Sequence, residues 1–316
     1  MAYYLGIDGG GSKTTCAIGD EASLLASGDA GPSNITRVGE NRARESLHRA
    51  VREACAAAKI DSHQIQRACV GLAGAGREEV AATMRKIVAE VIPGEIQVVG
   101  DTVTSVESAF GAGPGVIVIS GTGSIAYGRN AQGQTARAGG WGFAVSDEGS
   151  AHWIGRALVR DLLRAIDQKL GSTNEIQAIA DAFPLFRQIQ GAWNVRSLDE
   201  FVRAANSQPD FASLFPLIVA EDAEDVTASV LSRAGGELAQ LAAIVTRRLF
   251  ANETGNDARV YVAMVGGVFR HSAIVRESFC RELQKLDPRV QVKPEIVEPV
   301  VGALQMARHA ATTARR

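Results

Sequence analysis

The chain has 316 residues, of which 46% are hydrophobic and 22% charged, and its formal net charge at pH 7 is −2. This length allows two domains of ordinary size, and the composition is that of a soluble globular enzyme or binding protein. A nearly neutral chain has no overall field to attract nucleic acid or an anionic membrane, so the sequence predicts neither partner.

The cysteines and the N-terminal stretch indicate the compartment. Cys16, Cys55, Cys69 and Cys280 are widely spaced and form no CxxC pair, so we expect small buried apolar residues in a reducing environment. The N-terminus lacks the basic and apolar regions of a signal peptide, and no uninterrupted apolar run reaches the ~18 residues of a membrane span. We therefore expect a cytoplasmic protein.

The N-terminal third predicts three strands in hairpins, followed by alternating helices and strands. Strands are expected at 3–8, 13–18, 22–28, 68–73 and 96–99, helices at 40–58 and 78–91, and a loop at 31–34. This order is typical of a mixed α/β sheet.

After a glycine-rich linker at 111–115 the same order begins again. Strands are expected at 116–119, from 125, and running toward Gly139, and then a helix at 153–170 and a mostly helical insertion at 176–250 whose longest helix covers about 222–250. A turn at 252–257, a strand at 259–265, a helix at 271–286, a strand at 290–292 and a helix at 300–313 complete the prediction.

Two glycine-rich turns repeat one pattern. Residues 7–12 (IDGGGS) match 119–124 (ISGTGS) at a constant separation of 112 positions, and each turn lies between two predicted strands. Successive N–H groups in such a turn can converge on an anion, and Ser and Thr hydroxyls add donors, although a hairpin needing positive φ would look the same. Two copies on duplicated domains favour a cleft that holds a polyphosphate.

Two better-known phosphate motifs do not fit. Ser12, not glycine, precedes Lys13, so the first turn is not a Walker A loop. Residues 121–126 match GxGxxA, but the following residues are typical of a hairpin rather than of the helix that a dinucleotide site needs.

Two aspartates follow apolar strands. Asp8 lies inside the first turn, where a carboxylate beside polyphosphate suits a shared Mg²⁺ ion; the alternative is a turn residue bonded to its own backbone. Asp101 follows the strand at 96–99 and is either a general base for a substrate hydroxyl or the N-cap of a helix that begins at Thr102.

Two further glycine-rich stretches could bind a ligand. The stretch 139–150 could bind a sugar through the Trp141 indole and the Asp147 carboxylate, or it could be a connection whose Ser150 caps the next helix. Beyond it, His152 is expected to be a packed helix residue. Gly266 and Gly267 end a buried strand, where a flat ring such as adenine could lie against the backbone, or where helix and strand pack closely.

Together these motifs resemble the sugar-kinase, Hsp70 and actin superfamily. More narrowly, GIDGGGSKT, ISGTGSIAYG, GGWGFAVSDEGSAHWIG, VAMVGGVF and EPVVGALQMA are similar to motifs of the BadF/BadG/BcrA/BcrD-type ATPase family, which includes N-acetylglucosamine kinase. The resemblance covers nearly the whole chain, leaving out mainly about 176–215.

The resemblance implies two ribonuclease-H-like, actin-like ATPase domains around a nucleotide cleft. These would be residues 1–113 plus 301–316, and residues 114–300 with the helical insertion, with ATP and Mg²⁺ between them. The matched phosphate and adenosine positions are Gly9, Gly10, Gly11, Ser12, Lys13, Thr14, Gly121, Thr122, Gly123, Ser124, Gly266 and Gly267, with Asp8 near the metal. Asp101 matches the catalytic base, and Asn34, Gly140, Trp141 and Asp147 match sugar contacts. His152 stands where relatives often carry an aromatic residue.

The function expected from this resemblance is ATP-dependent phosphorylation of an amino sugar, N-acetylglucosamine or glucosamine, on the 6-hydroxyl. One alternative is the ATPase activator of a 2-hydroxyacyl-CoA dehydratase, but no cysteine lies in the second turn to hold its iron-sulfur cluster. A non-catalytic sugar sensor is another, but Met1 is only seven residues before Asp8 and leaves no room for a helix-turn-helix. The helical insertion offers surface for a homodimer.

Overall fold

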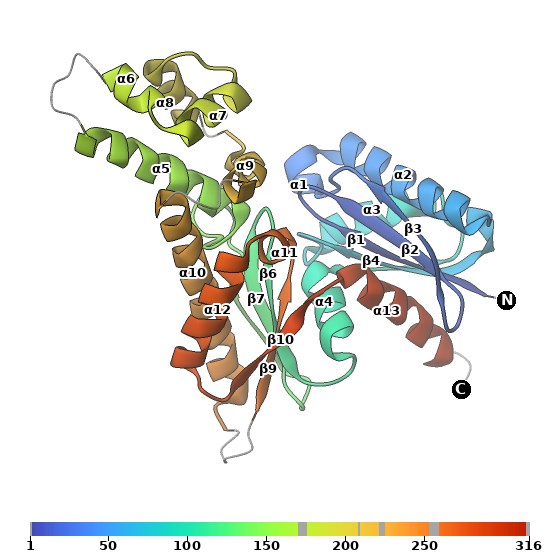
Figure 1. Ribbon diagram of the computed structural model, residues 1–316. Coiled ribbons are helices and arrows are strands. Elements are labelled where there is room, and N and C mark those ends of the chain that lie inside the picture. Colours follow the sequence, from blue (N-terminus) through green and yellow to red (C-terminus); the bar gives the residue numbers. More distant parts are fainter. Residues whose placement is uncertain (1, 170–175, 208, 221–224, 253–258, 314–316) are drawn as a thin grey trace.

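The computed structural model describes residues 2–169, 176–207, 209–220, 225–252 and 259–313 (Figure 1). These residues form two five-stranded sheets of identical topology. The first sheet contains β1 (Tyr3–Gly9), β2 (Thr14–Gly19), β3 (Leu24–Ala30), β4 (Ile65–Leu72) and β5 (Glu95–Gly100). The second contains β6 (Gly115–Ser120), β7 (Ser124–Arg129), β8 (Thr135–Gly139), β9 (Val260–Val265) and β10 (Val290–Val297).

The strand orders are β3-β2-β1-β4-β5 and, in the equivalent direction, β8-β7-β6-β9-β10. In each sheet the first three strands are antiparallel and the last two run parallel to the first. The predicted mixed α/β class and the predicted duplication are both confirmed.

The helices of the first half follow the predicted pattern closely. They are α1 (Ile35–Val38), α2 (Glu40–Ala58), η1 (Ser62–Gln64), α3 (Glu78–Ala89) and α4 (Asp101–Phe110). In α2 the buried residues Leu47, Ala50, Val51 and Ala54 recur at helical spacing, so one face of the helix lies on the first sheet. The short helix α1 was not predicted.

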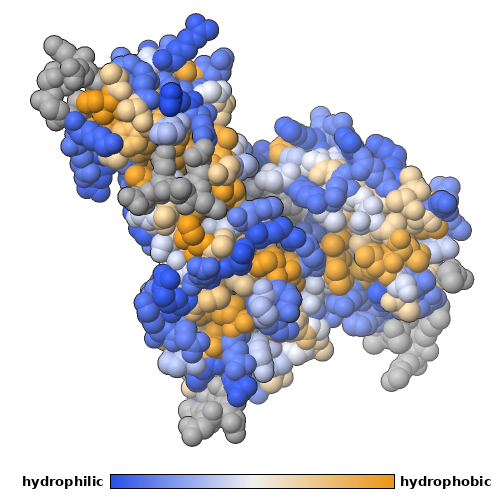
Figure 2. All heavy atoms as spheres, in the orientation of Figure 1, coloured by the Kyte–Doolittle hydropathy of each residue, from blue (hydrophilic) through white to orange (hydrophobic). Residues whose placement is uncertain are grey.

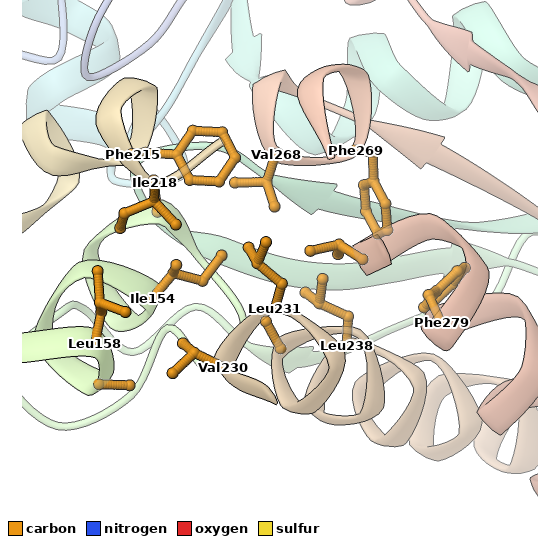
Figure 3. Close-up of a cluster of buried hydrophobic side chains, with 14 of the residues drawn as sticks. Ile154, Leu158, Phe215, Ile218, Val230, Leu231, Leu238, Val268, Phe269 and Phe279 are labelled. Atoms are coloured by element: carbon orange, nitrogen blue, oxygen red, sulfur yellow. The ribbon is translucent and has the colours of Figure 1, made fainter. Parts of the chain in front are cut away.

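The second half carries the helical insertion. Its helices are α5 (Ala151–Lys169), α6 (Ile176–Asp181), α7 (Pro184–Trp193), α8 (Leu198–Asn206), η3 (Phe211–Leu214), α9 (Phe215–Ala220) and α10 (Asp225–Phe250). Figure 3 shows how Ile154, Leu158, Ile218, Val230 and Leu231 converge in one core that joins the insertion to the second half. The expected turn at 252–257 lies almost entirely outside the described residues, as do residues 170 and 222–224 of the expected helices.

Near the C-terminus two predictions need correction. The helix expected at 271–286 corresponds to α12 (Ala273–Leu286) and begins two residues later than predicted, because Ser272 has an extended backbone and its Oγ accepts from the Val275 N–H. The separate short helix α11 (Gly267–His271) was not predicted. The strand expected at 290–292 extends through β10. The last helix is α13 (Pro299–Thr313).

Two crossing helices join the halves. Helix α4 leaves the first sheet and packs Val106 and Ala109 against the second, while α13 leaves the second and packs Leu304 against the first. They touch so closely that a Cβ added to Gly302 would lie 2.1 Å from the Thr104 carbonyl oxygen.

The helices in the described part of the chain are all too short or too polar to span a membrane.

Candidate functional site

The two glycine-rich turns meet tip to tip. The Ser12 Oγ lies 2.8 Å from the Thr122 Oγ1, at hydrogen-bonding distance. A Cβ on Gly11 would come within 3.2 Å of the same Thr122 atom. The tertiary structure therefore brings together two segments that the sequence related only by their repeated pattern.

The glycines of the turns differ in what surrounds them. A Cβ on Gly9 would lie 2.2 Å from the Leu72 side chain, so this position is closed by packing. A Cβ on Gly10 would meet only ordinary contact at 3.7 Å, and one on Gly121 would meet no described atom within 4 Å. Open space with backbone amides and hydroxyls around it fits a polyphosphate.

Lys13 and Thr14 have partners of their own. The Lys13 ammonium forms an exposed ion pair with Asp29 at 2.9 Å. The buried Thr14 hydroxyl is 2.7 Å from the Gly31 carbonyl oxygen and 2.8 Å from the Ser33 Oγ. Thr14 thus attaches the loop after β3 to the first turn, and any contact of these two residues with a nucleotide remains a prediction.

Asp8 and Asp101 lie close enough for the charge of Asp101 to act on Asp8. Burial, Asp101 and Glu298 together raise the pKa of Asp8 to about 7, against the opposing charge of Lys13. Burial also raises the pKa of Asp101, partly offset by the Thr102 N–H that donates to its Oδ1 at 2.9 Å. Both residues keep some exposed surface, but protein atoms surround their carboxyl groups.

Neither aspartate occupies the capping or turn position that the sequence allows as its alternative role. Helix α4 begins at Asp101 itself, and Gly100 occupies the N-cap position. Among the described residues, no hydrogen bond joins the Asp8 side chain to the backbone. No group of three His, Cys, Asp or Glu side chains there is arranged to hold a metal. A lone carboxylate fits Mg²⁺, because Mg²⁺ keeps several waters and is also held by substrate phosphates.

The loop after β3 places Asn34 against the first turn. The backbone N–H groups of Ser33 and Asn34 both donate to the Gly10 carbonyl oxygen at 3.1 Å. The Asn34 Oδ1 caps α1 by accepting from the Thr36 N–H at 3.2 Å and from its hydroxyl at 2.7 Å. The Nδ2 group of Asn34 has no partner among the described residues and is available to a ligand.

The loop after β8 holds Asp147 against the second turn. Asp147 has a φ of 62° and is 8% exposed, and its Oδ2 would lie 2.8 Å from a Cβ on Gly123. Burial raises its carboxyl pKa, although N–H groups of Gly142 and Ser124 counteract this effect. A left-handed, enclosed aspartate is a costly arrangement, and such residues are concentrated at binding sites.

Other residues of this loop have different surroundings. The glycines Gly139, Gly140, Gly142 and Gly149 all have positive φ. Trp141 is 68% exposed, and the Arg137 guanidinium carbon lies 4.2 Å from the centroid of its ring, so a sugar contact through this indole remains a prediction.

The residues after the loop are placed as expected. Ser150 caps α5 through the Trp153 N–H, and the buried His152 ring packs between Phe143 and Phe211.

Gly266 lies beside the second turn. Its φ is 102°, and a Cβ there would lie 2.3 Å from the Ser120 carbonyl oxygen. Gly267 begins α11. The predicted adenosine and phosphate positions are thus neighbours in space.

Sequence reasoning missed one acidic residue of the site. Glu298 ends the β10–α13 connection, which is equivalent in topology to the β5–α4 connection that carries Asp101, and it acts electrostatically on Asp8. The same strand-end argument that selected Asp101 could have found it. A surface hollow of about 580 Å³ lies between α10 and α12, and none of the predicted residues lines it.

Comparisons with a family model and with two curated relatives each cover nearly the whole chain. The model of the BadF/BadG/BcrA/BcrD ATPase family matches residues 5–307. The chain is 28% identical to an N-acetylmuramic acid/N-acetylglucosamine kinase of Clostridium acetobutylicum, over 98% of this chain and 99% of the relative. It is 27% identical to an N-acetyl-D-glucosamine kinase of Dictyostelium discoideum, over 96% and 97%.

A solved structure shows the same fold. It belongs to a candidate N-acetylglucosamine kinase from Chromobacterium violaceum, and it matches with a TM-score of 0.69 and 22% identity over 97% of this chain and 99% of the other.

Proposed function

The chain belongs to the BadF/BadG/BcrA/BcrD ATPase family, and we propose that it transfers the γ-phosphoryl group of ATP to a hydroxyl of an amino sugar, N-acetylglucosamine or a close derivative. The observation that carries this proposal is the position of Asp101 at the first residue of α4, where its charge acts on Asp8 in the strand that leads into the first turn. The kinase names of two relatives aligned over nearly the full chain support it.

In this proposal each group of site residues binds a different part of the substrates. The open turns hold phosphate oxygens through backbone N–H groups and the hydroxyls of Ser12 and Thr122. Asp8 would hold Mg²⁺, and the ion would neutralise charge on the phosphates. Adenine lies against the backbone beside Gly267, which follows the tightly packed Gly266, and Asn34 and Asp147 orient the sugar from the loops after β3 and β8.

Asp101 is the proposed base, acting on the 6-hydroxyl. A carboxylate whose pKa is raised by burial accepts a proton more readily than an exposed one, and it stays ionised when its pKa remains below the working pH. Positioning and charge neutralisation supply most of the catalysis in phosphoryl transfer. Asp101 therefore holds the hydroxyl in line and takes its proton.

The dehydratase-activator alternative lacks supporting residues in the structure. Cys16, Cys55 and Cys69 are buried, and burial raises the pKa of the Cys69 thiol to about 12. Cys280 in α12 is only half-buried, contrary to the expected burial, although burial still raises the pKa of its thiol. Protonated, enclosed thiols are poor cluster ligands. Sharing of a metal cluster between two subunits is therefore not proposed, and a homodimer through the insertion remains a prediction.

The test is ATP turnover with Mg²⁺ and a panel of N-acetylglucosamine, glucosamine, N-acetylmannosamine, glucose and no sugar. We expect sugar-dependent ADP formation, with a kcat about 10²–10⁴-fold lower in Asp101→Asn. The matched control is Asp199→Asn, since Asp199 also lies in the first turn of a helix but on the exposed surface of α8. ADP formation that is indifferent to every sugar would contradict the proposal.

A further inference from the structure

An ion pair joins the helical insertion to the first half beside the tip of the first glycine-rich turn. The Arg37 Nη2 in α1 lies 2.6 Å from the Asp210 Oδ2, immediately before η3. Figure 1 shows α1 and α9, which follows η3, facing each other, and Figure 2 shows the surface indented between these two parts. The side chains are 29% and 51% exposed, so solvent reaches the pair.

Arg37 is held at the rim of the proposed site. Its Cδ would lie 3.5 Å from a Cβ on Gly11, so the stem of the side chain rests on the tip of the first turn. It shares the four-residue helix α1 with the cap Asn34, one of the proposed sugar contacts. The arginine head therefore reaches past the phosphate turn toward the insertion.

The Arg37 guanidinium lies on the side of the site where the sugar is proposed to bind. His152 is close enough to feel the charges of Arg156, Asp210 and Arg37. The His152 ring packs against Phe143 of the loop after β8, at 4.8 Å between centroids. Arg37 and Arg156 act on His152 as positive charges and Asp210 acts on it as a negative one, so these three side chains lie near the same ring.

We propose that Arg37 determines acceptance of amino sugars that carry a carboxylate substituent, and that Asp210 is the internal counter-ion which such a carboxylate replaces. This inference rests on the proposed sugar kinase function and deepens it. With a neutral sugar the Arg37–Asp210 pair stays intact. With an acidic sugar, such as one bearing a lactyl ether, the guanidinium binds the substrate carboxylate at the solvent-accessible rim.

The physical basis is an exchange of one carboxylate for another. An exposed ion pair contributes little stability, because water screens both charges and the side chains lose freedom. A substrate carboxylate held in place by the rest of the sugar pays less of this entropic cost, and a guanidinium can bind it through two parallel hydrogen bonds. A neutral sugar gains nothing from the exchange, so the pair discriminates by charge.

The test compares kcat/KM for N-acetylmuramic acid with kcat/KM for N-acetylglucosamine, using the full chain with Mg²⁺ and ATP. We expect the ratio to fall about 10- to 100-fold in Arg37→Gln. Arg37→Lys should lie between the two, and Asp210→Asn should raise the ratio by removing the competing carboxylate. The matched control is Arg49→Gln, because Arg49 forms an exposed ion pair with Glu53 on α2, away from the cleft; its ratio should not change.

Each other outcome has a definite meaning. If the wild type phosphorylates N-acetylglucosamine but not N-acetylmuramic acid, or if Arg37→Gln lowers both activities equally, the inference is overturned and the kinase function stands. Equal loss would make the pair a simple latch between the two halves. If the wild type phosphorylates no sugar, the proposed function itself fails, and the inference fails with it.

Discussion

The two halves of the molecule share one topology but differ at equivalent positions. Asp8 at the end of β1 corresponds to Ser120 at the end of β6. The Asp8 carboxyl has a pKa raised to about 7, whereas the Ser120 hydroxyl donates to the Gly149 carbonyl oxygen at 2.9 Å. At this position the first half therefore carries a buried carboxyl group, and the second half carries a structural hydrogen bond.

The loops after β3 and β8, and the connections after β5 and β10, can be compared between the two halves in the same way. The loop after β3 brings Asn34 to the first turn, and the loop after β8 brings Asp147 to the second. The connection after β5 carries Asp101, and the one after β10 carries Glu298. The loops thus carry an amide in one half and a carboxylate in the other, whereas the connections carry a carboxylate in both halves.

Making the first turn resemble the second should have the largest effect. We expect Asp8→Ser to lower kcat by on the order of 10²–10³, since it removes the charge that would hold Mg²⁺ near the phosphates. Ser120→Ala removes only a hydrogen bond and should cost about 1 kcal/mol of stability. Steady-state kinetics and urea unfolding of both variants measure this asymmetry; equal kinetic losses would show that the halves do not differ in this way.

The raised pKa of Asp8 predicts a pH dependence of stability without ligand. Its pKa is about 7 in the folded state and near 3.8 when unfolded, so the folded state binds the proton more tightly. The stabilisation is complete below about pH 4 and is lost as the pH rises to about 7, with a slope of at most about 1.4 kcal/mol per pH unit. The difference in unfolding free energy between Asp8→Asn and the wild type should therefore change over this range in favour of the variant. Asp199→Asn should show no such trend.

The junction between the halves offers a purely steric test. Gly302→Ala should destabilise the protein by about 1–3 kcal/mol or more, because the new Cβ would lie 2.1 Å from the Thr104 carbonyl oxygen where α13 crosses α4. The control is Gly236→Ala in α10, which meets no described atom within 4 Å and should stabilise by about 0.5–1 kcal/mol. Thermal unfolding compares them, and a neutral Gly302→Ala would mean that the helices can separate freely.

The smallest effects on stability and KM are expected at positions where the two turns are alike. Gly121→Ala places a methyl group in open space, and Gly10→Ala places one in ordinary contact with the Lys13 carbonyl oxygen at 3.7 Å. Each should leave stability within about 1 kcal/mol and raise the KM for ATP about tenfold by occupying phosphate space. If only one variant responds, the phosphates lie on one turn rather than between both.

Much of the fold follows from local pattern. The bounds of α2 agree with the expected 40–58, because its apolar stripe is uninterrupted and ends before Lys59, which adopts the left-handed conformation. The break at Ser272 was not predicted, because a serine can continue a helix or cap one, and packing decides between these. The short α1 depends on its Asn34 cap and its position beside the first turn rather than on any periodicity.

The sequence by itself determined the repeated glycine turns, the α/β order of each half and the presence of aspartates at strand ends, since these depend on neighbours along the chain. Only the tertiary structure decided that Ser12 touches Thr122, that Asp8 feels Asp101 and Glu298, and that Arg37 meets Asp210. Coulomb interaction and desolvation depend on distance and enclosure in space, and those arise when α4 and α13 cross and bring the halves together.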